Sequence, residues 1–199
     1  MIKFEKVSKY KDVDINLPKR KTKYSAGYDF EVAEDTVIQP MSVLQEKIAE
    51  TIEPGWVMSL DDIAARTKQQ KAKPTLVPTG VKCHLDPNTY LQLSVRSSCP
   101  LKYWLVLANG VGIIDADYCD NPDNEGEIFF QIINLGPAPI ILRKGDVIGQ
   151  GIIQEYKLTD DDFAEGLRQG GFGSTDFEKE ITEIFNGVFR SPEASQSKH

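Results

Sequence analysis

Two aspartates and a tyrosine lie close together in the stretch NGVGIIDADY, which covers residues 109–118. Asp115, Asp117 and Tyr118 follow directly on an apolar, strand-like run that ends at Ile114. A carboxylate held at the end of a strand can take a proton from an attacking water, which is a role that Asp can perform in hydrolysis. A polar turn after a strand has the same composition. This stretch by itself therefore leaves both interpretations open.

Two further stretches offer groups that bind phosphate or magnesium. Arg96, Ser97 and Ser98 follow an alternating strand pattern over 91–95, and an Arg with two hydroxyls can bind a phosphate chain. Asp29 in AGYDF could hold the hydration shell of Mg²⁺, which keeps several waters and favours carboxylates beside substrate phosphates. Each stretch is equally typical of an ordinary strand end or turn.

The most unusual stretch is GGFGST at 170–175. Its closely spaced glycines expose backbone N–H groups, which suits close wrapping around phosphates. Phe172 offers a flat ring on which a base can stack, and Arg168 adds a positive charge. A flexible tail is the alternative. Gln150 in KGDVIGQ is similarly ambiguous, because it fits either a turn or an amide aimed at a phosphate oxygen.

Composition excludes several classes of function. The 199 residues suffice for one domain with a full core, and the net charge of -7 argues against a broad nucleic-acid-binding face. Cys83, Cys99 and Cys119 form no CxxC pair, which argues against a structural zinc site and fits a reducing compartment. No apolar run approaches the ~20 residues of a membrane span. We expect a soluble, cytoplasmic protein.

Most of the chain has the pattern of short strands separated by turn residues. Alternating or apolar runs predict strands at 36–39, 91–95, 128–133, 139–142 and 147–156. Many short strands at this spacing predict an all-β fold, as a sandwich, jelly roll or barrel.

Residues 41–74 depart from the strand pattern and predict a helical insertion. Ser42 with Gln45, and Ser59 with Asp62, have the spacing of helix-capping boxes. The basic residues of this segment are typical of a solvated helix face. A binding site for another protein here is a second, weaker hypothesis.

The C-terminus also departs from the strand pattern. We predict an arm over 166–190, with an amphipathic helical pattern from Phe177 to Val188, and a disordered tail over 191–199. The whole chain, 1–199, is then one domain with an insertion and an arm.

Taken together and in order, five stretches resemble the five motifs of the trimeric dUTP diphosphatases (dUTPases). They are AGYDF (26–30), VRSS (95–98), NGVGIIDADY (109–118), KGDVIGQ (144–150) and GGFGST (170–175). Each is weak alone, but five in the correct order are specific. The resemblance implies a jelly-roll-like subunit of a homotrimer, with each active site built from three chains. It also implies Mg²⁺-dependent hydrolysis of dUTP to dUMP and pyrophosphate.

The resemblance further implies a role for each matching residue. Asp115 would orient and deprotonate the water that attacks the α-phosphorus, Tyr118 would pack against the deoxyribose, and Asp29 would bind Mg²⁺ through water. The uracil edge would be read by Asn109 and the backbone of Gly112, Ile113 and Ile114. The phosphate chain would be held by Arg96, Ser97, Ser98 and Gln150. The arm would close over the substrate with Phe172 on the uracil and, near the phosphates, Arg168, Gly173, Ser174 and Thr175.

Three positions depart from the family pattern. Arg168 lies four residues before Phe172 instead of five, which leaves its contact with the γ-phosphate open. The stretch CDNPDNE (119–125) intervenes after the motif tyrosine, and Asp176 replaces the usual glycine. We expect the CDNPDNE stretch to reshape the rim of the substrate channel or a subunit contact.

Two alternatives remain on the sequence alone. A dCTP deaminase shares the expected fold and an Arg-Ser-Ser motif, although the IDADY signature fits diphosphate hydrolysis better. A regulatory protein that keeps the dUTP site as a ligand sensor belongs to a different class. The insertion and the extended tail are the features that suggest it.

Overall fold

Strand β6 (Thr89–Val95) shows how the apolar pattern builds the core. Leu91 and Leu93 are buried, while the alternating residues Tyr90 and Gln92 are partly exposed, as period-two alternation requires.

The computed structural model describes residues 1–49, 59, 62, 73–166, 168, 170 and 171 of the chain.

Most of the regular secondary structure in the described residues is β-strand, so the all-β prediction is confirmed. The strands are β1 (Lys3–Lys6), β2 (Tyr28–Glu31), β3 (Thr36–Ile38), β4 (Thr75–Pro78), β5 (Val81–His84), β6, β7 (Leu105–Leu107), β8 (Gly112–Asp115), β9 (Phe129–Asn134), β10 (Ile140–Leu142) and β11 (Val147–Glu155). The helical elements are η1 (Ser8–Tyr10), α1 (Met41–Ala49), α3 (Ser98–Tyr103) and η2 (Ala116–Tyr118).

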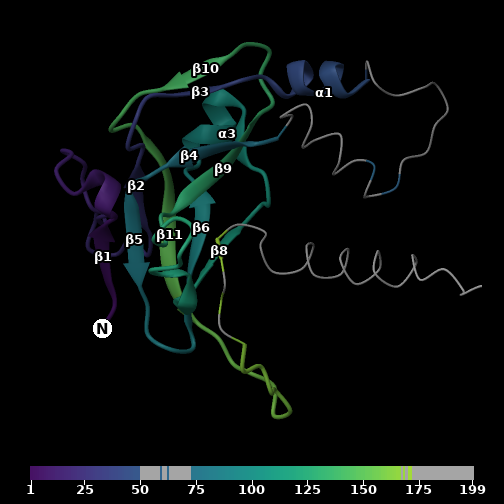
Figure 1. The fold of residues 1–199 in the computed structure, drawn as a ribbon. Coiled ribbons are helices and arrows are strands. Elements are labelled where there is room, and N and C mark those ends of the chain that lie inside the picture. Colours follow the sequence, from purple (N-terminus) through teal and green to yellow (C-terminus); the bar gives the residue numbers. More distant parts are fainter. Residues whose placement is uncertain (50–58, 60–61, 63–72, 167, 169, 172–199) are drawn as a thin grey trace, which may run out of the picture.

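The strands pair in antiparallel sheets (Figure 1). One sheet has the order β2-β11-β6-β8 and another the order β4-β9-β7, with the pairs β1-β5 and β10-β3 beside them. The core lies between the two larger sheets, where the rings of Phe30 on β2 and Phe130 on β9 are 5.7 Å apart. A side chain on Gly149 of β11 would collide with the Phe130 ring, so this position requires glycine.

The turn between β10 and β11 connects strands of different sheets. It is closed by a bond of 2.9 Å from the Asp146 N–H to the Arg143 carbonyl oxygen, with Gly145 in the left-handed region at φ +88°. However, β10 pairs with β3, whereas β11 pairs with β2 and β6. The turn therefore carries the chain from one sheet to another and does not close a hairpin.

The predicted insertion begins with a helix, as expected. Helix α1 starts at Met41, so Ser42 lies inside its first turn and not before it. Ser59 and Asp62 form the predicted capping box: the Ser59 hydroxyl donates to Asp62 Oδ2 over 2.7 Å, and the Asp62 N–H donates back to Ser59 Oγ over 3.2 Å. Residues 50–58, 60, 61 and 63–72 of the insertion lie outside the described residues.

The predicted C-terminal helix and the tail over 191–199 also lie outside the described residues. Within the described ranges, no helix combines the length and the apolar character that crossing a bilayer requires.

Candidate active site

Asp115 lies at the end of β8, which is the edge strand of the four-stranded sheet. It is paired with Tyr90 of β6, and about half of its side chain, 51%, is exposed. The short helix η2 begins directly afterwards, so Asp117 and Tyr118 are held one turn beyond the strand. The local sequence therefore places a solvent-accessible carboxylate next to a tyrosine.

Arg168 binds both aspartates of this stretch. Its Nη2 donates to Asp115 Oδ2 over 2.5 Å, and its Nε donates to Asp117 Oδ1 over 2.9 Å. Its guanidinium carbon lies 5.6 Å from the centre of the Tyr118 ring. The arginine predicted to contact the γ-phosphate thus lies against the predicted base of its own chain. Asp117, to which the sequence assigned no catalytic role, orients this arginine.

Tyr118 is almost fully buried, at 4% exposure. Its hydroxyl donates to the Glu127 carbonyl oxygen over 2.9 Å and accepts from Asn124 Nδ2 over 2.8 Å. Burial raises the pKa of Tyr118 above its ordinary value, although the Asn124 bond and the Arg168 charge oppose this. The phenol is therefore neutral and fixed in orientation, with its ring covered by Arg168.

The loop 119–125 supplies contacts that the sequence did not assign. Asn121 Nδ2 donates to Asn124 Oδ1 over 2.7 Å, which orients the amide that reaches Tyr118. Asp123 Oδ2 accepts from the Gly171 N–H over 2.7 Å, so the same loop holds the start of the predicted arm. The sequence feature that indicates this hydrogen-bond network is the concentration of Asn and Asp in CDNPDNE, since these side chains provide donors and acceptors for local networks.

Lys82 anchors this loop to β5. Its buried amine donates to Asp120 Oδ1 over 2.5 Å and to Glu125 Oε1 over 2.9 Å. Burial alone would lower the pKa of Lys82, but the two carboxylates outweigh burial and raise it. The hydrogen bond from Lys82, together with bonds from Ser8, lowers the pKa of Glu125 to about 2.

The residues predicted to bind phosphate and Mg²⁺ lie together at a different place on the same sheet. Gln150 of β11 is paired with Asp29 of β2 on one side and with Ser94 of β6 on the other. Beyond β6, the Arg96 N–H donates to the Ile148 carbonyl oxygen over 3.4 Å, and Ser97 precedes α3. A cavity of about 430 Å³ opens here, and Arg96 and Ser98 are among its lining residues.

Asp29 has an observable feature that fits a cation. Its Oδ2 is buried and finds no hydrogen-bond donor among the described residues. A buried carboxylate oxygen without a donor is costly, and an ion or its bound water would satisfy it. The residue type and the environment are therefore compatible with a hydrated Mg²⁺.

The two groups of residues lie at opposite ends of β6. Asp115 is paired with Tyr90, and Arg96 follows six residues later along the same chain direction. At the rise of a β-strand this spacing amounts to roughly 20 Å. One chain therefore does not bring the predicted base to the predicted phosphate residues.

Asn109 lies in the connection between β7 and β8. β7 pairs with β9 and β8 pairs with β6, so this connection is a corner between sheets and not a hairpin. Gly110 adopts φ +69° there, and Gly112 is paired with Leu93. Along β8, Ile114 is buried, while Ile113 is 51% exposed on the opposite face.

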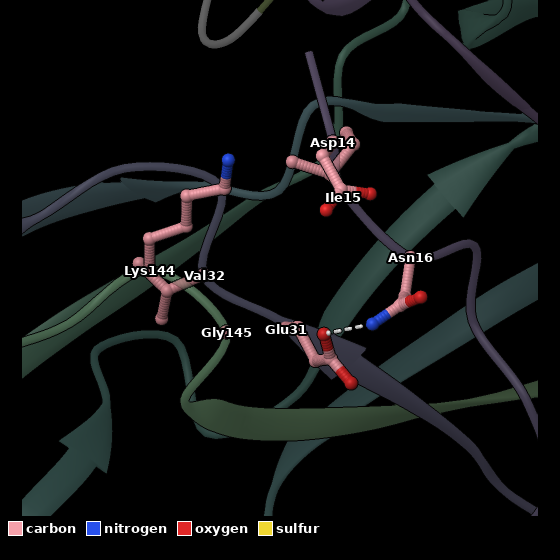
Figure 2. Close-up of a pocket in the computed structure, with 7 residues that line it drawn as sticks. All are labelled: Asp14, Ile15, Asn16, Glu31, Val32, Lys144 and Gly145. Carbon is pink, nitrogen blue, oxygen red and sulfur yellow. Dashed lines mark hydrogen bonds between the residues drawn. The ribbon is translucent and has the colours of Figure 1, made fainter.

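A smaller cavity of about 230 Å³ lies beside the turn 143–146 (Figure 2). Lys144 lies across it from Asn16, whose amide donates to Glu31 Oε2 over 3.0 Å. None of the residues predicted to bind substrate lines this cavity.

The predicted arm residues Phe172, Gly173, Ser174 and Thr175 lie outside the described residues.

Comparison with known proteins identifies the family. A family model described as dUTPase matches residues 59–177, which is more than half of the chain. This chain belongs to the dUTPase family. The family resemblance inferred from the five motifs is thereby confirmed.

Relatives cover most of the chain. The deoxyuridine 5'-triphosphate nucleotidohydrolase of Lactococcus lactis subsp. lactis (strain IL1403) is 37% identical over 174 residues, which are 86% of this chain and 95% of that protein. The crystal structure of the dUTPase from Streptococcus mutans has a TM-score of 0.60 at 36% identity, covering 79% of this chain and 98% of that one. The jelly-roll-like dUTPase fold is confirmed.

A phage relative shares the fold at lower identity. A mutant of the dUTPase from phage phi11 of S. aureus has a TM-score of 0.55 at 18% identity, covering 83% of this chain and 97% of that one. That structure is described as showing the coordination of a structural Mg(II) ion.

Proposed function

We propose that this protein hydrolyses dUTP to dUMP and pyrophosphate by attack of water on the α-phosphorus. Family membership carries the proposal, because relatives named deoxyuridine 5'-triphosphate nucleotidohydrolase align over most of the chain. The position of Asp115 supports the reaction type, since an accessible carboxylate at a strand end can serve as a general base.

The active sites are shared between subunits of a homotrimer. A general base must come within about 3 Å of the proton that it removes. Asp115 and Arg96 are roughly 20 Å apart within one chain, so the base of one subunit has to meet the phosphate residues of another. Exposed Ile113 and Val111, close to Asp115, provide apolar surface that assembly would cover.

The protein groups neutralise charge before water attacks. The negative oxygens of a triphosphate repel a nucleophile, and Arg96 with the hydroxyls of Ser97 and Ser98 offsets that charge. Asp115 then accepts a proton from the water, and pyrophosphate leaves. Gln150 contacts the phosphate chain from β11, next to Asp29. Mg²⁺, when bound through water to Asp29, supplies further neutralisation of the phosphate oxygens.

Uracil is read by the edge of β8. Every second residue of an edge strand directs its N–H and C=O away from the neighbouring strand, and these groups can pair with the donors and acceptors of a base. Gly112, Ile113 and Ile114, with Asn109 at the corner, provide this edge. The Tyr118 ring, fixed by Glu127 and Asn124, then packs against the deoxyribose.

Arg168 has two positions in this proposal. Against Asp115 and Asp117 it covers both the base and the Tyr118 ring. Substrate binding draws Arg168 to the phosphates as the arm closes with Phe172, Gly173, Ser174 and Thr175, which excludes water.

Three further predictions from the sequence stay predictions. They are the single-domain organisation of 1–199, a protein partner for the insertion 41–74 and the cytoplasmic location.

An assay on four nucleotides tests the function. The protein is incubated with Mg²⁺ and dUTP, dCTP, dTTP or UTP, and pyrophosphate and ammonia are measured. We expect pyrophosphate from dUTP alone. Ammonia from dCTP would establish a deaminase instead, and tight dUTP binding without turnover would establish a sensor.

A further inference from the structure

Outside the candidate active site, three side chains that bind metals converge beside β5. His84 ends β5, Cys119 follows η2, and Asp120 is the next residue. One ligand atom from each, namely a ring nitrogen, a sulfur and a carboxylate oxygen, lies within 4.8 Å of the other two. His84 and Cys119 are partly buried and Asp120 is exposed, so an ion can enter from solvent.

The spacing of His84 and Cys119 matches zinc coordination. Zn–N bonds of about 2.1 Å and Zn–S bonds of about 2.3 Å at a tetrahedral angle place nitrogen and sulfur about 3.6 Å apart. His84 Nδ1 and Cys119 Sγ are 3.6 Å apart. A hydrogen bond from the thiol also fits this distance, and Lys82 holds the carboxylate of Asp120 next to it, so the three ligand groups stand together before any ion binds.

A surrounding shell already orients the ligands. His84 Nε2 lies 3.0 Å from Glu5 Oε2 of β1, so the ring nitrogen that faces away from the cluster is engaged by a carboxylate. This is the arrangement that commonly fixes the orientation of zinc-binding histidines. Lys82 holds Oδ1 of Asp120, and Asp120 adopts φ +61°, a conformation that needs support from its surroundings.

We propose that His84, Cys119 and Asp120 form a binding site for Zn²⁺, with a water as fourth ligand. Binding releases the Cys119 thiol proton to solvent, because zinc binds the thiolate. The ion would connect β5 to the residue directly after Tyr118 and so pin the loop 119–125. Its role is structural, since Asp115 and the phosphate residues do not belong to the cluster.

Cobalt provides the direct test, because Co²⁺ substitutes for zinc and its thiolate complexes absorb light by charge transfer. The full chain is stripped of metal, supplied with excess Mg²⁺ and titrated with Co²⁺. We expect a thiolate-to-cobalt absorption band that saturates at one Co²⁺ per chain and that Zn²⁺ abolishes. Cys119→Ser and His84→Asn should each lose the band.

Matched variants separate this site from general thiol binding. Cys99→Ser should keep the band, because Cys99 is buried elsewhere and donates to the Ile148 carbonyl oxygen. Glu5→Ala should weaken Co²⁺ binding about 10- to 100-fold, as loss of an outer-shell partner does, whereas Glu31→Ala should not. Absence of a band in the unmodified chain, or its persistence in Cys119→Ser, would overturn the proposal. Circular dichroism confirms that each variant is folded.

Discussion

Arg168 Nη2 lies 2.5 Å from Asp115 Oδ2, which joins the start of the C-terminal arm to the carboxylate at the end of β8. The arginine engages a carboxylate oxygen that, in the proposed reaction, would accept the proton of the attacking water. In the proposed function this pairing is the resting state, from which Arg168 moves to the phosphates when substrate binds.

Replacing Asp115 tests its role as the general base. Asp115→Asn should retain dUTP binding and lose kcat by ~10² to 10⁴-fold, because an amide cannot accept the water proton. Pyrophosphate release and calorimetric titration with dUTP measure the two effects. Asp117→Asn is the control, since it also removes a negative charge beside Arg168 but leaves the base in place. Near-normal kcat in Asp115→Asn would remove Asp115 from this role.

Mixing two inactive variants tests whether active sites are shared. If Asp115 and Arg96 of one site come from different chains, random trimers of Asp115→Asn and Arg96→Ala subunits regain intact sites. About a quarter of the sites should be intact after a 1:1 mixture is unfolded and refolded together. If each site belongs to one chain, every site keeps a defect and no activity returns. Each variant refolded alone is the control.

Removing the Tyr118 hydroxyl tests the network behind the site. Tyr118→Phe leaves the Glu127 carbonyl oxygen and an Asn124 N–H unsatisfied in a buried place. We expect the free energy of unfolding to fall by about 1–3 kcal/mol. Urea denaturation at a fixed protein concentration measures this. Tyr24→Phe, at a residue that is 88% exposed, should change stability little, and equal effects in both variants would contradict the network.

The Lys82–Glu125 pair predicts a pH dependence of stability. The pKa of Glu125 is about 2 in the folded chain, against an ordinary value of 4.5. A lowered carboxyl pKa stabilises the fold above the ordinary value, and this contribution is lost as pH falls from 4.5 towards 2. Glu125→Gln should therefore be less stable at neutral pH and show a flatter decline in acid.

Denaturant midpoints measured from neutral to acidic pH check this difference. Glu165→Gln, at an exposed residue, should follow the unmodified chain. Parallel curves for the unmodified chain and Glu125→Gln would show that this carboxyl contributes no acid-dependent stability.

Sequence alone determined the family and some of the strands. Five short motifs in order predicted the dUTPase family, and the run at 91–95 predicted β6, because period-two alternation is a local property that burial on one face imposes. The capping box of Ser59 and Asp62 is equally local, since both partners lie within one helical turn.

Tertiary structure decided the relations between distant residues. Cys119 has no metal-binding neighbour at CxxC spacing, and only strand pairing and the loop after η2 bring His84 to within 3.6 Å of it. The separation of Asp115 from Arg96 likewise follows from the register of β8 on β6. A local sequence pattern does not predict this register. Arg168 meets Asp115 from far along the chain. Register and loop closure depend on packing across the whole core, so the sequence identified the reacting groups while only the fold determined which of them meet.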